Sequence, residues 1–274
     1  MASEDNVLQM PQTQGLVACR SVFISDIHLG TRGCRADLLL EFIRELRCEK
    51  LYLVGDIVDG WKMAQSGFYW PQTHNDVVQK LLRLSRKGVE VIYVPGNHDH
   101  RVRDFCGVHF GGVRVLKEAV HTAADGRRYL VVHGDAFDGV VQQARWLAKA
   151  GDIAYRLLLA SNSHLNGLQK RLGLSPWSLA AFMKARVKQA LQFIDDFERS
   201  VARAARDQGL DGVICGHIHK AEMREIDGIA YINDGDWVES CTAAIEHHDG
   251  RFELIDWRAV RNPPVAAAVL RSAA

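Results

Sequence analysis

The chain has 274 residues, of which 47% are hydrophobic and 24% are charged, and its formal net charge is +1 at pH 7. This length and composition predict one large globular domain, or one domain with a sizeable insertion, and exclude a chain that is disordered throughout. No apolar run reaches the ~18 residues that a membrane-spanning helix needs, so the sequence predicts no such helix.

Short β-branched runs alternate with helical patterns along most of the chain. Apolar residues recur at helical spacing in 37–46, where Asp37 suits the first turn, and in 75–88, where Asn75 is the expected N-cap and Gly88 the closing glycine. This alternation is typical of a largely parallel sheet in an α/β protein. Further strands are expected in 228–237 and 241–257, the last two joined by a turn at Asp249 and Gly250.

Five of the predicted strands end in polar signatures. They are D-x-H at 26–28, G-D-x-x-D at 55–59, G-N-H-D at 96–99, H-G-D at 133–135 and G-H-x-H at 216–219. Because ligands in α/β sheets bind beyond the carboxyl ends of the strands, we expect all five signatures to converge on one edge. Their Asp, Asn and His side chains suit Mn²⁺, Zn²⁺ or Fe as ligands.

Each signature alone could be an ordinary loop, a turn or a helix cap. All five together, in this order, resemble the calcineurin-like metallophosphoesterases. The resemblance implies a four-layer αββα sandwich and two divalent metal ions, with Mn²⁺ preferred over Zn²⁺ or Fe. Mapped by motif, it implies one ion held by Asp26, His28, Asp56 and His219 and a second held by Asp56, Asn97, His133 and His217, with Asp56 bridging them.

Two cations close together would activate a shared water and neutralise the phosphoryl oxygens of a phosphoester. We expect His98 to lie outside the metal ligands, as a catalytic residue that contacts the phosphoryl or leaving oxygen. In the resembling family the last Asp of G-D-x-x-D orients this histidine, which implies a catalytic role for Asp59. Asp99 and Asp135 are expected to brace loops or hold neighbouring side chains. His74 is expected near a helix cap, with the cleft as the alternative.

About eighty residues separate H-G-D from G-H-x-H, far more than one crossover helix needs. We predict a domain at 19–260 with a helical cap inserted at 138–208, and flexible termini at 1–18 and 261–274. Residues 140–206 hold eleven basic and four acidic side chains. These are a solvated face or, alternatively, the basic rim of an apolar groove for an amphiphile at a membrane surface. The second interpretation gives the candidate substrate-binding residues Tyr155, Arg156, Lys184, Arg186 and Lys188.

The position of this cap resembles a narrower branch, the UDP-2,3-diacylglucosamine hydrolases. That resemblance implies cleavage of a pyrophosphate in a nucleotide-linked glycolipid, which releases UMP. The branch typically carries arginine where this chain has His98. A phosphodiesterase or phosphatase of another substrate, including a nuclease, is therefore an alternative, although cap bases interleaved with Leu, Ala and Phe disfavour nucleic acid. An inactive scaffold is a remote alternative, because every expected ligand is present.

The cysteines and the N-terminus indicate a compartment. Six irregularly spaced cysteines form no Cys-x-x-Cys pair. The first residues lack the basic and then apolar pattern of a secretory signal peptide. We therefore expect reduced thiols in a cytoplasmic protein, and a lipid substrate would add peripheral contact with the inner face of the cytoplasmic membrane.

Overall fold

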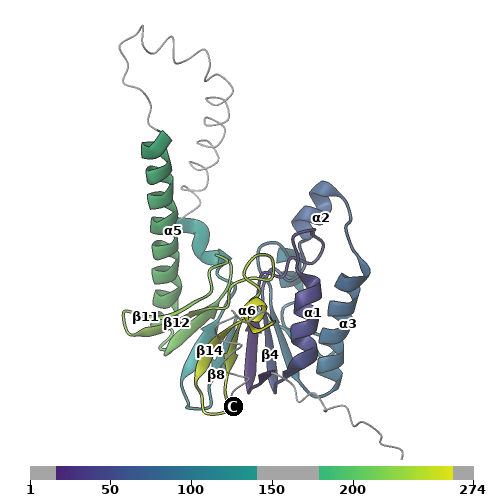
Figure 1. Ribbon diagram of the computed structural model, residues 1–274. Coiled ribbons are helices and arrows are strands. Elements are labelled where there is room, and N and C mark those ends of the chain that lie inside the picture. The colour runs from purple at the N-terminus through teal and green to yellow at the C-terminus, as the bar shows by residue number, and fades with distance from the viewer. Residues whose placement is uncertain (1–16, 141–178, 262–274) are drawn as a thin grey trace, which may run out of the picture.

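Two β-sheets stand face to face in the computed structural model, which describes residues 17–140 and 179–261 (Figure 1). The larger sheet runs, edge to edge, β14 (Phe252–Asp256), β13 (Thr242–Glu246), β2 (Ser21–Ile24), β4 (Lys50–Val54), β5 (Glu90–Val94), β7 (Val113–Val115) and β6 (His109–Phe110). The smaller runs β11 (Glu222–Ile226), β12 (Ile229–Asn233), β10 (Gly212–Cys215), β9 (Arg128–Val131) and β8 (Ala119–Thr122). β1 (Val17–Ala18) and β3 (Leu46–Arg47) form a separate parallel pair.

Parallel pairing brings the carboxyl ends of the central strands to one edge. β2, β4, β5 and β7 are parallel neighbours in the larger sheet. In the smaller sheet β10 lies parallel to both β9 and β12. The remaining pairs are antiparallel, including β13 with β14, whose connection contains the predicted Asp249–Gly250 turn. The five signatures therefore leave from one end of the sandwich, three from the larger sheet and two from the smaller.

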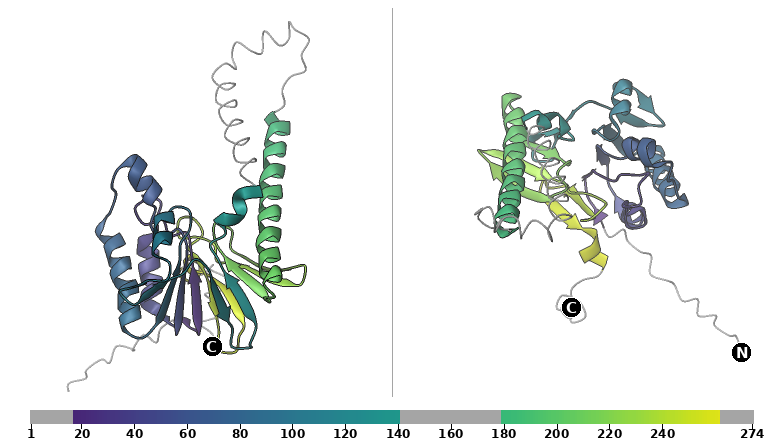
Figure 2. Two further views of the ribbon diagram at one scale, coloured as in Figure 1. Left: turned by 180° about the vertical axis from the view of Figure 1, so that it is seen from behind. Right: turned by 90° about the horizontal axis from the view of Figure 1, so that it is seen from above.

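Helices cover the two outer faces. Figure 2 shows α1 (Ala36–Glu45) and α3 (Gln72–Arg86) on the side of the larger sheet, and α5 (Leu179–Asp207) on the side of the smaller. α1 buries an apolar stripe that includes Leu39, Phe42 and Ile43. Between the sheets the rings of Phe23 and Tyr52 stack with centroids 4.6 Å apart. These four layers confirm the αββα sandwich. A single sheet with helices on both faces, as the strand–helix rhythm alone suggests, is not what forms.

The first turn of α3 corrects one prediction. The helix starts at Gln72 with Pro71 in the N-cap position, so Asn75 is not the cap. The reason is His74, which is buried and begins the buried stripe of the helix. A histidine does not count as apolar in a periodicity search, so the search starts the helix one turn late. Gly88 follows the C-cap with φ 94°, as expected.

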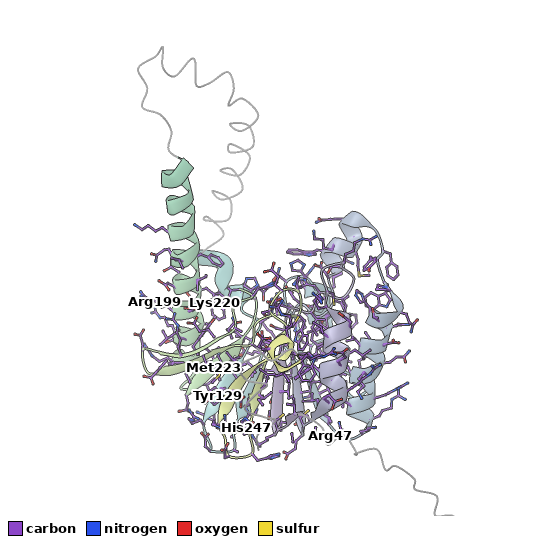
Figure 3. The ribbon with its side chains drawn as sticks, in the orientation of Figure 1. Arg47, Tyr129, Arg199, Lys220, Met223 and His247 are labelled. Carbon is purple, nitrogen blue, oxygen red and sulfur yellow. The ribbon has the colours of Figure 1, made fainter. Side chains whose placement is uncertain are left out.

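The second half of α5 is part of the sandwich. Phe197, Val201 and Ala205 are buried against the smaller sheet. Buried Glu198 pairs with Lys220, at 3.7 Å, and with Arg224 (Figure 3 labels Lys220 beside α5). The C-terminal end of the span predicted as a cap therefore packs as the fourth layer. Residues 141–178, with Tyr155 and Arg156, lie outside the described residues, and the cap itself stays a prediction. No described helix is both long and apolar enough to cross a membrane.

Candidate metal centre

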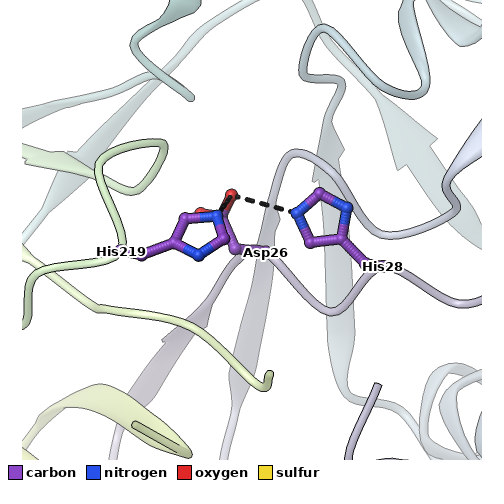
Figure 4. Close-up of side chains that lie close together, drawn as sticks. All are labelled: Asp26, His28 and His219. Atoms are coloured by element: carbon purple, nitrogen blue, oxygen red, sulfur yellow. Dashed lines mark ion pairs between the residues drawn. The ribbon is translucent and has the colours of Figure 1, made fainter. Parts of the chain in front are cut away.

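The strand-end side chains meet in one cluster, in which Asp26, Asp56 and His133 are buried and His219 is exposed. Figure 4 shows Asp26, His28 and His219 directed toward one another. Asp26 Oδ1 lies 3.0 Å from His219 Nε2 and 3.7 Å from His28 Nε2. These three side chains come from the loops after β2 and β10, so the centre joins the two sheets. They form one of three described groups whose ligand atoms are close enough to hold a metal ion.

Asp56 lies at the middle of the cluster. Its Oδ2 is 3.4 Å from His133 Nε2, and 3.9 Å from the Nε2 atoms of both His28 and His98. Its Oδ1 accepts a hydrogen bond of 2.8 Å from the backbone N–H of His98. Asp56 therefore reaches both halves of the cluster, which is the position that a bridging ligand requires.

The outer nitrogens of the histidines fix which ring atom faces the cluster. His28 Nδ1 lies 3.0 Å from Asp59 Oδ2, and His133 Nδ1 lies 2.8 Å from the carbonyl oxygen of Val54. Both Nδ1 atoms face acceptors, so each carries the proton and leaves its Nε2 lone pair toward the cluster. Metal-binding histidines in proteins are held in this way.

The backbone at these positions adopts an unusual conformation. Five expected ligands have φ between 49° and 72°, in the left-handed region that residues other than glycine rarely adopt: Asp26, His28, Asp56, His217 and His219. Among the described residues only Asp227 and Cys241 share this property without being glycine. Strained backbone of this kind is maintained where the surrounding structure and the function require it.

Two glycines allow the loops to approach this closely. A Cβ at Gly96 would lie 2.3 Å from Asp56 Oδ1, and one at Gly216 would lie 2.6 Å from Asp26 Oδ2. Such distances are far inside van der Waals contact, so any larger residue would displace a carboxylate. The glycines of G-N-H-D and G-H-x-H are therefore required by packing against the ligands.

The electrostatics of the cluster favour a cation. Burial lowers the pKa of His28, but hydrogen bonds to Asp26 and Asp59 outweigh it and raise the pKa to about 10. His133 follows the same pattern: burial lowers its pKa, and Asp26 and Asp56 raise it to about 10. Burial raises the pKa of Asp26, yet its histidine neighbours lower it to well below its ordinary value. The carboxylates therefore stay ionised and attract positive charge, whether protons or a metal ion.

The donor atoms also fit metal ligation. Asn97 Oδ1 and His133 Nε2 are buried and have no hydrogen-bond partner of normal geometry. Buried polar atoms without partners are uncommon in folded proteins and need an explanation. His217 donates its backbone N–H to Asp26 Oδ2 at 2.8 Å, and its ring centroid lies 5.0 Å from that of His133. Oxygen and imidazole donors converge here without a thiolate, a set that divalent cations prefer.

His98 stands beside the cluster, partly exposed. Its Nδ1 lies 2.9 Å from Asp59 Oδ1, which leaves Nε2 toward the cleft. Asp59 also contacts His28 and caps α2 (Gly60–Ser66) by accepting the N–H of Lys62 at 2.7 Å. The two expected catalytic residues are therefore in contact. The second contact of Asp59, with His28, was not predicted.

Sequence reasoning missed two contributors. Trp61 packs against His98 with ring centroids 4.9 Å apart and ring planes tilted by 42°, and its Nε1 donates to His100 at 3.2 Å. Ser25 Oγ lies 2.7 Å from Asp26 Oδ2 and 2.5 Å from Asp234 Oδ1. Burial raises the pKa of Asp234 well above its ordinary value, which favours a protonated carboxyl at this contact. Both have a weak sequence signal: Trp61 directly follows G-D-x-x-D-G, and Asp234 follows a strand.

Asp99 and Asp135 brace loops, as expected. Asp99 accepts backbone N–H groups from Ile57, at 2.8 Å, and from Gly96, at 2.6 Å, and so ties the loops after β4 and β5 together. Asp135 pairs with Arg103 at 2.7 Å and fixes the 3₁₀ helix η1 (His100–Phe105). Of the expected substrate-binding residues on α5, Lys188 is exposed, while the side chains of Lys184 and Arg186 lie outside the described set.

The αββα sandwich and this cluster define a hydrolase with a candidate metal site. The family model of calcineurin-like phosphoesterases matches residues 19–221, and the chain belongs to this family. The UDP-2,3-diacylglucosamine hydrolase of Neisseria gonorrhoeae is 27% identical over 231 residues, which cover 79% of this chain and 89% of that protein. Its namesake from Xanthomonas campestris pv. campestris is 28% identical over 247 residues, covering 84% and 96%. A solved phosphoesterase from E. coli is 14% identical, with a TM-score of 0.41 over 86% of this chain and 98% of its own.

Proposed function

We propose that the protein is a dinuclear metal-dependent pyrophosphate hydrolase that cleaves a UDP-2,3-diacylglucosamine-type substrate and releases UMP. The observation that carries the hydrolytic proposal is the central position of Asp56, whose Oδ2 lies within 3.9 Å of three histidine Nε2 atoms. In this proposal Asp26, His28, Asp56 and His219 hold one ion, and Asp56, Asn97, His133 and His217 hold the other. Mn²⁺ is the proposed metal, with Zn²⁺ and Fe as alternatives.

The divalent ions supply an activated water and neutralise phosphoryl charge. The remaining roles fall to the protein. His98 presents Nε2 toward the cleft and donates a proton or a hydrogen bond to the oxygen that leaves phosphorus. Asp59 Oδ1 lies 2.9 Å from His98 Nδ1 and orients the ring, and donation from Nε2 uses the imidazolium form, in which both ring nitrogens carry a proton. Trp61 covers one face of the His98 ring and limits its rotation.

The substrate proposal is supported by the similarity of this chain to the two UDP-2,3-diacylglucosamine hydrolases described above. We propose that the protein acts in the cytoplasm and meets its lipid substrate at the inner face of the membrane. The basic residues of the 138–208 span would then face anionic headgroups. The presence of His98 in place of the arginine of that branch favours one second candidate, a phosphodiesterase or phosphatase of another substrate.

A substrate panel in Mn²⁺ tests the proposal. The full-length protein is offered UDP-2,3-diacylglucosamine, bis-p-nitrophenyl phosphate, a phosphomonoester and single-stranded DNA. We expect the glycolipid to give the highest kcat/KM and to release UMP. Faster hydrolysis of the generic diester than of the glycolipid would support the second candidate. A dominant rate on DNA that falls steeply with salt would indicate a nuclease.

A further inference from the structure

A pocket of about 770 Å³ opens from the metal centre away from α5. One wall is formed by His28, Asp59, His98 and His219. The other is formed by two loops, 30–33 after β2 and 67–69 between α2 and α3. Figures 1 and 2 show α2 and α5 projecting beyond the same end of the sandwich on opposite sides. The pocket therefore extends the site on the side of α2, opposite α5.

The far wall is aromatic, and its Phe68 ring contributes little to the core. Phe68 is 76% exposed, the highest value among the exposed large apolar residues of the described chain. It stacks with Trp70 at 6.1 Å between centroids. Exposing a large ring to water is unfavourable, so a ring held in a pocket beside a catalytic centre is a candidate ligand contact.

Buried His74 fixes this wall in place. Its Nδ1 accepts the backbone N–H of Gly30 at 3.1 Å, which ties the loop after β2 to the start of α3. The rings of Tyr69 and Trp70 meet His74 edge-on, at 5.8 Å and 5.5 Å between centroids. The aromatic wall and the loop that carries Arg32 are thus joined through one side chain, and the pocket is preformed.

Two basic side chains line the pocket together with the rings. The guanidinium of Arg32 sits 4.6 Å from the centroid of the Tyr69 ring. Among the described residues no carboxylate is seen to pair with Arg32, which leaves its hydrogen-bond donors for an anion. Lys62 lines the same pocket. The pocket therefore combines histidines of the candidate metal centre, positive charge and flat rings.

We propose that this pocket binds the nucleoside monophosphate half of the substrate, with the base against Phe68 and Tyr69 and its phosphate near Arg32 and Lys62. The inference deepens the proposed function and rests on it for the identity of the substrate. The glycolipid half then extends toward α5. Flat aromatic faces beside a guanidinium favour a base and a phosphate. An acyl chain would instead need a continuous apolar groove, whereas this lining includes Thr31 and three glycines.

The test compares two ligands that differ only in the base. Affinities of Mn²⁺-loaded full-length protein for UMP and for ribose 5-phosphate are measured by calorimetry. We expect UMP to bind at least about tenfold more tightly, because base stacking on an aromatic side chain is typically worth that much or more. Phe68→Ala should remove that advantage, and Tyr69→Leu should reduce it. Arg32→Ala should weaken both ligands alike, since it removes charge and keeps the Phe68 ring.

Phe110 provides the matched control, because it is 73% exposed and lies on edge strand β6 outside the pocket lining. Phe110→Ala should change neither affinity. Equal affinity of the parent for both ligands would overturn the inference. So would a Phe68→Ala variant that loses affinity for decyl phosphate and not for UMP. Hydrolysis of the four panel substrates by the parent separates the two proposals. Hydrolysis without Phe68-dependent UMP binding rejects the pocket alone, and Phe68-dependent UMP binding without hydrolysis of any panel substrate rejects the proposed function alone.

Discussion

The metal centre and the aromatic wall border one pocket but are built in opposite ways. Around the metal centre every loop is constrained: five ligands have left-handed backbone, and glycines admit carboxylates at distances that no Cβ tolerates. In the wall at 67–70 no residue other than glycine has left-handed backbone, and the Phe68 side chain is exposed. The difference teaches that the expected metal ligands are encoded in short motifs with little conformational freedom, whereas the wall that we propose for nucleotide binding carries no motif.

Asp56→Ala should have the largest effect on activity, because it changes the constrained metal centre and not the aromatic wall. Asp56 contacts both halves of the cluster, so its loss should remove metal and lower turnover of bis-p-nitrophenyl phosphate by on the order of 10³-fold or more. Metal analysis and initial rates measure this. Asp135→Asn, which changes a carboxylate that pairs with Arg103, is the control and should retain metal. Parental turnover by Asp56→Ala would show that the cluster is not the hydrolytic site.

His98→Ala tests whether His98 transfers a proton or binds a metal ion. We expect kcat to fall by about 10²–10⁴-fold while both ions stay bound, because His98 faces the cleft and contacts Asp59. His109→Ala changes an exposed histidine on β6 and should be neutral. Loss of metal from His98→Ala would instead make this histidine a ligand.

Phe197→Ala tests whether α5 is part of the packed core that supports the metal centre. Phe197 is buried and packs against Gly134 of the H-G-D loop. A Cβ added at Gly134 would lie 2.7 Å from the Phe197 Cζ atom. Its truncation should lower the free energy of unfolding by about 3–5 kcal/mol, the usual cost of removing a buried ring. Leu191→Ala lies on the same helix with 58% exposure and should change it by less than about 0.5 kcal/mol. Chemical denaturation measures both, and equal effects would contradict the assignment of α5 to the core.

The smallest expected effect lies far from the site and tests pH dependence. Burial would raise the pKa of Glu246, but hydrogen bonds with His121 and from the backbone N–H of Ala124 outweigh it and lower the pKa to about 2. A lowered pKa stabilises the fold at pH values above the pKa of the unfolded chain, about 4.5. This stability is lost as the pH falls toward the folded pKa of about 2. Glu246→Gln should therefore cost roughly 1–3 kcal/mol at pH 7 and progressively less below pH 4.5. A cost that is unchanged between pH 7 and pH 2.5 would contradict this origin.

The sequence predicted the site better than its surroundings. Five signatures at strand ends are informative because polar residues after apolar strands stand out, and parallel pairing brings them together. The start of α3 was missed because buried His74 acts as an apolar residue there. The short strands β6 and β7 and helix α2 were missed because two to seven residues are too few to show a period. The joining of Tyr69, Trp70 and Gly30 through His74 depends on contacts between distant segments, which no local pattern records.

The central claim is that the strand-end motifs form a two-metal hydrolytic centre. Equilibrium dialysis of the full-length protein against Mn²⁺, followed by metal analysis, tests it most directly. We predict two ions per chain in the parent and fewer in Asp56→Ala, with bis-p-nitrophenyl phosphate turnover rising as the second ion binds. One ion per chain at full activity, or turnover that does not depend on added metal after chelation, would contradict the account.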